Sequence, residues 1–245
     1  MISNLEVARI AQMAFILEPI SNKPGLTTRY TNKNRNLKLE NFLVAGLNIG
    51  DSFRELSDRI SNCKTLPITY DIALQAQKDS FKNRIGTRLI YGGIISLFPI
   101  VITQRFLKLT NPFYILDNIE SVLKLTHPDD TLYYQELENF AYSHSNNHKQ
   151  YMFDIKNDYV NMFDYYEKGL AAIGEVDNTK GDRAKTGSSN KEILNGYPIL
   201  RRMLDIYYNN IRNGHYPGIS ETLEEIDFIT RREFPDAHPQ WLADL

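Results

Sequence analysis

The sequence contains one cysteine, Cys63, among its 245 residues. A single thiol cannot close an internal disulfide bond or supply a cysteine-based zinc site, so both of these devices are excluded. The scarcity of cysteine fits a cytoplasmic protein, since the cytoplasm keeps thiols reduced. Because a solitary thiol is usually a small packing residue, we do not expect Cys63 to act as a nucleophile.

A strong excess of one charge is also lacking. There are 28 basic and 30 acidic residues, which gives a formal net charge of −2. General binders of nucleic acid or of membrane surfaces carry a clear basic excess, so neither kind of partner is expected.

Long hydrophobic runs are missing as well. The most apolar stretch, residues 89–102, is too short to span a membrane and is interrupted by Gly92, Gly93, Ser96 and Pro99. The N-terminus shows no basic segment followed by an apolar one, so no signal peptide is expected. We interpret residues 89–102 as part of a buried core helix.

Sustained alternation of apolar and polar residues, the pattern of a half-buried strand, is absent from the sequence. Apolar residues recur instead at helical spacing, with a capping-box pattern at Ser3 before the first such segment. Helices are expected over about 3–18, 38–60, 70–82, 89–107, 111–125, 126–144, 150–173, 191–212 and 219–234. The sequence therefore predicts an all-α protein, a single domain over residues 1–245 with about eight to ten helices.

The segment 18–30 presents charges on a rigid turn after the first helix. Pro24 fixes φ and Gly25 permits backbone angles that other residues avoid. Lys23, Arg29 and Glu18 therefore lie close together in the sequence around a preset turn. Two cations in this setting suit a polyanionic ligand such as a triphosphate, although a helix-ending turn with solvated charges explains the same residues.

This segment resembles the opening of the triphosphoribosyl-dephospho-CoA synthase family, especially its archaeal branch. The resemblance is carried by Ala14-Phe-Ile-Leu-Glu18, Lys23-Pro24-Gly25, Arg29-Tyr30 and Glu40-Asn41-Phe42-Leu43. It implies a transferase that moves the 5-triphosphoribosyl group of ATP to the 2′-hydroxyl of 3′-dephospho-CoA and releases adenine. The resemblance implies ATP and a dephospho-CoA-like molecule as small-molecule partners, with Mg²⁺ accompanying ATP. Association of the chain into a homo-oligomer is left open.

The resemblance also assigns roles to the residues of this turn. Glu18 would be the general base or would stabilise the oxocarbenium ion; the plain alternative is an exposed glutamate at a helix end. Lys23, Gly25 and Arg29 would bind the phosphates of the substrate, and the alternative for each cation is a solvated surface side chain.

Four further residues match the family more loosely. Asp130 would contact magnesium or substrate, although capping of its own helix is the simpler role. Asp154 and Asp158, spaced i and i+4, would hold Mg²⁺, with Asp154 also a catalytic candidate; an exposed acidic helix face is the alternative. Gly92 matches a glycine that we expect to contact substrate.

The chain departs from the family where a polar motif is usual. The family has Asn-Thr-Asn-x-Gly or Asn-Thr-His-x-Gly where this chain has Arg88-Leu89-Ile90-Tyr91-Gly92. Two hypotheses therefore stand. The first is an active nucleotide-dependent transferase, and the second is a divergent, non-catalytic helical paralogue that binds a nucleotide or a partner.

Overall fold

The computed structural model of the protein describes residues 2–20, 38–84, 89–143, 160–176 and 189–215, together with Glu225, Phe228 and Arg232. Its helices are α1 (Asn4–Ile20), α2 (Leu39–Asn48), α3 (Gly50–Ser61), α4 (Tyr70–Asp79), α5 (Tyr91–Leu107), α6 (Pro112–Asp117), α7 (Ile119–Leu123), α8 (Pro128–Ser143), α9 (Met162–Val176), α10 (Ser189–Leu194) and α11 (Pro198–Arg212). No strand occurs in these described ranges. The expected all-α class is confirmed.

In the described part of the chain, α2 with α3 and α6 with α7 each form one helix divided by a single residue; counted in this way the helices number nine, within the expected eight to ten. Ile49 separates α2 from α3 within the helix expected over 38–60, and Asn118 separates α6 from α7. At the first division, Gln12 of α1 donates from Nε2 to the Leu47 carbonyl oxygen over 2.7 Å. A side chain that inserts into the ladder of helical hydrogen bonds bends a helix, so Gln12 accounts for this division.

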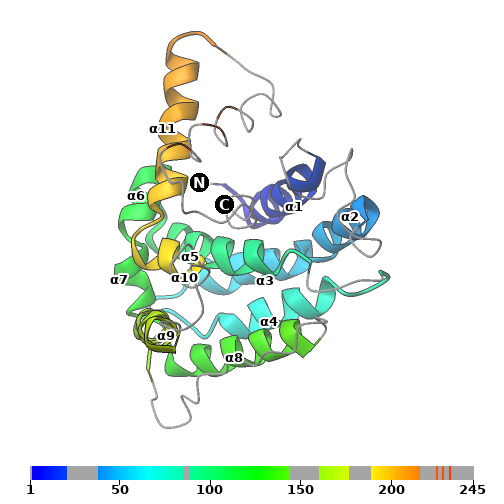
Figure 1. The fold of residues 1–245 in the computed structure, drawn as a ribbon, viewed down its shortest axis with the longest axis vertical. Helices are drawn as coiled ribbons and strands as arrows, with labels where there is room; N and C mark the ends of the chain where they lie inside the picture. The colour runs from blue at the N-terminus through cyan, green and yellow to red at the C-terminus, as the bar shows by residue number, and fades with distance from the viewer. Residues whose placement is uncertain are drawn as a thin grey trace.

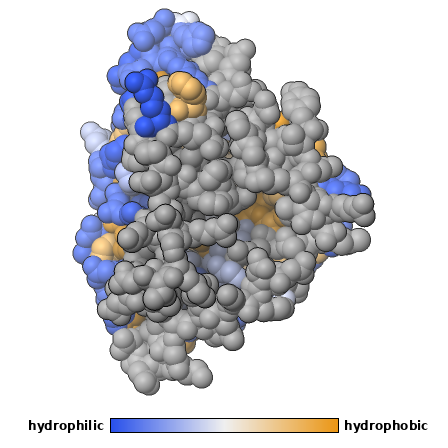
Figure 2. Space-filling view, viewed as in Figure 1, coloured by the Kyte–Doolittle hydropathy of each residue, from blue (hydrophilic) through white to orange (hydrophobic). Residues whose placement is uncertain are grey.

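Helix α5 lies at the centre of the arrangement. It contacts α1, α3, α4, α6, α7 and α10, and Ile94, Phe98 and Ile102 on it are fully buried. Figure 1 shows α4 and α8 lying side by side, with α11 forming one edge of the molecule. The surface along that edge is mostly hydrophilic, with a few apolar residues among the polar ones (Figure 2). The apolar run seen in the sequence is therefore the core helix that it predicts.

The core is rich in aromatic rings that join five helices, α3, α4, α5, α8 and α9. Phe98 of α5 lies 5.1 Å from Phe53 and 6.1 Å from Tyr70, measured between ring centroids. Tyr134 of α8 lies 5.8 Å from Tyr70 and 5.4 Å from Tyr166 of α9. The hydroxyl groups of Tyr70 and Tyr166 are 3.1 Å apart and hydrogen-bond to each other. Buried tyrosines need such partners, so these pairs fix how the rings are arranged.

Glycines let α1 approach α2 and α5 closely. A Cβ atom at Gly46 of α2 would lie 3.1 Å from Cβ of Phe15, and a Cβ atom at Gly93 of α5 would overlap the Phe15 ring. Phe15 itself is buried. The close neighbour at Gly93 is therefore a packed helix, which places the end of α1 against the beginning of α5.

We expect the Gly93→Ala variant to lose about 1–3 kcal/mol of the free energy of unfolding, because the added methyl group overpacks the Phe15 ring. Urea denaturation followed by circular dichroism measures this loss. The same substitution made in a Phe15→Leu background is expected to cost less, since the smaller side chain leaves room for the methyl group. An equal loss in both backgrounds would contradict the contact.

Candidate functional site

Five of the predicted site residues lie outside the part of the chain that the structure describes: Lys23, Gly25, Arg29, Asp154 and Asp158. Their roles in binding phosphate and magnesium stay predictions from the sequence.

Two predicted residues, Glu18 and Gly92, lie on helix ends that meet. Glu18 is half-buried in the last turn of α1. Phe15, one turn earlier, packs on Gly93, and Gly92 lies in the first turn of α5. The contact between these two helices therefore places the last turn of α1, which carries Glu18, beside the first turn of α5, which carries Gly92.

The residue that introduces α5 has a strained backbone. Ile90 has φ 55° and ψ 7°, in the left-handed region that β-branched residues rarely adopt. Its hydrocarbon side chain has no atom able to cap the helix. Strain of this kind costs of order 1–3 kcal/mol and is typical of functional sites, where the surrounding structure holds it in place.

A carboxylate joins α5, α8 and α9 near this point. Glu138 of α8 accepts hydrogen bonds from the hydroxyl of Tyr91, the first residue of α5, at 3.3 Å and from the hydroxyl of Tyr165 of α9 at 3.0 Å. Burial, reinforced by the charge of Glu138, raises the pKa of Tyr165, so its phenol stays protonated and donates. Two neutral donors on one carboxylate fix its position and reduce its freedom to rotate.

Little in the sequence indicates a special role for Glu138, which is one of several acids in its helix. The available signal is indirect. Tyr165 and Tyr166 are adjacent in the sequence, and a buried tyrosine hydroxyl needs a polar partner. Which acid becomes that partner depends on contacts between distant parts of the chain. Tyr91 precedes Glu138 by 47 positions, and Tyr165 follows it by 27.

Asp130, a predicted substrate or magnesium contact with capping as the simpler role, is fully buried and caps two helices. Its Oδ1 accepts from the backbone N–H of Thr69 at 2.7 Å and of Tyr70 at 2.8 Å, where α4 begins. Its Oδ2 accepts from the N–H of His127 at 3.1 Å, just before α8. Burial raises the pKa of Asp130, and these donors oppose that rise. The observed contacts are those of a cap.

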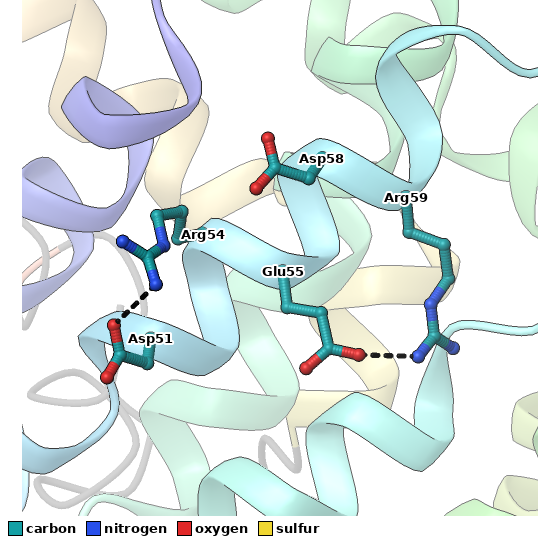
Figure 3. A pocket seen from close by; sticks show the side chains of 5 residues that line it. All are labelled: Asp51, Arg54, Glu55, Asp58 and Arg59. Carbon is teal, nitrogen blue, oxygen red and sulfur yellow. Dashed lines mark hydrogen bonds and ion pairs between the residues drawn. The ribbon is translucent and has the colours of Figure 1, made fainter.

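An open depression of about 630 Å³ lies on the outer face of α3 and is lined by Asp51, Arg54, Glu55, Asp58 and Arg59 (Figure 3). Both arginines in it have carboxylate partners: Arg54 lies 3.2 Å from Asp51, and Arg59 lies 2.7 Å from Glu55. Because three carboxylates face two guanidinium groups, the lining is acidic on balance. It is a poor site for a triphosphate.

Within the described ranges, no group of three or more histidine, cysteine, aspartate or glutamate side chains is placed to hold a metal ion. In that same part of the chain, every helix is too short or too polar to cross a membrane. Compared with protein-family models, with curated proteins and with solved structures, the chain gives no match.

Proposed function

We propose that the protein is a nucleotide-dependent transferase similar to triphosphoribosyl-dephospho-CoA synthase. Its substrates would be ATP, accompanied by Mg²⁺, and a dephospho-CoA-like acceptor. The proposal draws on the ordered sequence resemblance of the first fifty residues and on the arrangement of two helix ends.

The packing of Phe15 on Gly93 is the observation that carries the proposal. This contact brings the end of α1, with Glu18, to the beginning of α5, with Gly92. Both residues match positions in the resembled family, although they are separated by more than seventy residues of sequence. The two positions that carry the resemblance thus lie on helices that pack against each other.

The proposed reaction needs acids near the ribose. The bond between adenine and the anomeric carbon breaks, the acceptor 2′-oxygen bonds to that carbon, and adenine leaves with the proton that the hydroxyl loses. Positive charge grows on the sugar as adenine departs, so a carboxylate nearby lowers the barrier, and a second carboxylate can accept the proton. Glu18 is proposed for one of these roles and Glu138 of α8, which bonds to Tyr91 at the beginning of α5 and to Tyr165, for the other.

Release of adenine tests the proposal. We expect the protein, incubated with ATP, Mg²⁺ and dephospho-CoA, to produce adenine in step with consumption of the acceptor, measured by liquid chromatography. The Glu18→Gln variant is expected to be slower by about 100-fold or more, because general acid–base groups typically contribute that much. Glu136→Gln is the control, since it makes the same chemical change at a glutamate that is exposed on α8. Absence of adenine from well-folded wild-type protein would refute the transferase.

A second candidate is a protein that binds a nucleotide without catalysis. The observation that favours it is the apolar segment before Gly92: Leu89 is buried and Ile90 cannot donate or accept a hydrogen bond from its side chain. The resembled family has polar side chains at these positions. Calorimetric titration with ATP distinguishes the two, because this candidate requires binding heat with no adenine released.

A further inference from the structure

Helix α1 is apolar on its outer face as well as on its inner one. Exposed fractions are 39% for Ile2, 47% for Leu5, 55% for Ile10 and 57% for Met13. The inner face is buried in the core through Val7, Ala8, Ala11 and Phe15. A helix that is hydrophobic on all sides normally has neighbours on all sides, so this outer face has the character of an interface.

Two opposite charges lie in the middle of this apolar face. Glu6 and Arg9 are both exposed and lie three residues apart, between Leu5 and Ile10. With 3.6 residues per turn, the side chains of Leu5, Glu6, Arg9, Ile10 and Met13 fall on one side of the helix, within about 140°, and Ile2 lies two residues before the helix begins. We call these six side chains the outer stripe.

The outer stripe is complementary to itself when it is reversed. Its order along the chain is apolar, apolar, acidic, basic, apolar, apolar, and the midpoint lies between Val7 and Ala8. If a second copy of α1 runs antiparallel about that midpoint, the apolar side chains Leu5, Ile10 and Met13 of both copies lie around the two charges. Glu6 then faces Arg9 in both directions. This is the requirement for an isologous two-fold interface, in which one patch binds itself.

The beginning of α1 is held firmly enough to present the outer stripe. Arg105 of α5 donates from Nη1 to the Ile2 carbonyl oxygen at 2.8 Å, and its Nη2 contacts Asn4 Oδ1. Glu6 closes the capping box by accepting the Ser3 N–H at 2.6 Å. The segment that carries the outer stripe is thus fixed to the core, which lowers the entropic cost of association.

We propose that the outer stripe is the interface of a homodimer, in which α1 packs antiparallel against α1 of a second copy. A single helix pair buries less surface than a standard stable interface, so the dimer is reversible, with a dissociation constant on the order of 10 μM. The contact involves the first turns of α1, whereas Glu18 lies in the last. The inference therefore stands or falls independently of the proposed transferase.

Sedimentation velocity from 1 to 200 μM tests the dimer. Wild-type protein is expected to rise from the monomer mass towards twice that mass over this range. In Arg9→Glu, position 9 of each copy faces Glu6 of the other with like charge, so the dissociation constant is expected to rise at least tenfold. Arg54→Glu on α3 makes the same change in net charge at another exposed arginine and is expected to leave it unchanged.

Mixing two variants tests the register. Glu6→Arg and Arg9→Glu each place like charges opposite one another in their own dimers, and Glu6→Arg also loses the capping carboxylate. When the two are mixed, every charge at positions 6 and 9 meets an opposite one, so a mixed dimer is expected at wild-type concentrations. A wild-type protein that stays monomeric at 200 μM, as it would if residues 216–245 of the same chain covered the outer stripe, would overturn the proposal. So would a dimer that is indifferent to Arg9→Glu or a mixture that fails to associate.

Discussion

Replacement of Asp130 by alanine is expected to lower the free energy of unfolding by about 4 kcal/mol. The carboxylate is fully buried and accepts backbone N–H groups of Thr69, Tyr70 and His127 at 2.7, 2.8 and 3.1 Å. The first N–H groups of a helix have no helical carbonyl to bond, so these donors depend on the side chain. Each buried donor left without a partner costs about 1–3 kcal/mol, and partial relaxation keeps the total below the sum.

The asparagine variant separates loss of the cap from loss of volume. Asp130→Asn keeps one acceptor oxygen, but its NH₂ group must point either at the N–H of His127 or at the N–H groups of Thr69 and Tyr70. We therefore expect the asparagine variant to lose about half as much free energy of unfolding as the alanine variant. Asp129→Asn is the control, because that carboxylate lies in the same turn with its side chain 37% exposed, and it is expected to cost below about 1 kcal/mol. Urea denaturation gives all three values. Equal losses at positions 129 and 130 would show that Asp130 does not join α4 to α8.

Helix positions could be predicted because helical spacing records which face of each segment is buried. The buried run of α5 was predicted in this way. The sequence did not reveal that Phe15 packs on Gly93 of that helix. Nor did it reveal the division at Ile49, which depends on a side chain from 35 residues away, Gln12 bonding to Leu47. Local pattern gives an element's type, whereas its breaks depend on tertiary contacts.

The candidate site was predicted in a similar, partial way. Capping by Asp130 of its own helix was predicted from its place in a first turn, but the larger part of its role is to cap α4, through Thr69 and Tyr70 some sixty residues earlier. Glu138 and Glu192 were missed. A single acid within a helix carries no sequence signal of burial, because the groups that bury it and bond to it lie elsewhere in the chain.

Glu192 is expected to make the protein less stable as the pH rises from about 4.5 to 7. Its carboxyl group is 2% exposed and accepts from the N–H groups of Ile199 at 3.2 Å and Leu200 at 3.5 Å, where α11 begins. Burial raises the pKa of Glu192 from 4.5 to about 7, against the opposing effect of these two donors. Between these values the folded protein keeps a proton that the unfolded chain has lost. Stability therefore falls with rising pH, by about 3 kcal/mol over the whole interval, and is level above it.

The Glu192→Gln variant, which is neutral at every pH and keeps a carbonyl acceptor, is expected to remove this dependence. Urea denaturation from pH 4 to 8 should show the variant near the wild type at low pH and more stable by about 3 kcal/mol at pH 8. For Glu192→Ala, the free energy of unfolding relative to the wild type is expected to rise with pH in the same way. At every pH it should lie about 1 kcal/mol below that of the glutamine variant, because the cap is lost. A difference between glutamine variant and wild type that stays constant from pH 5 to 8 would contradict the assignment. Loss of a cap shifts stability equally at every pH, so only a buried carboxyl group that titrates in this interval produces a difference that grows.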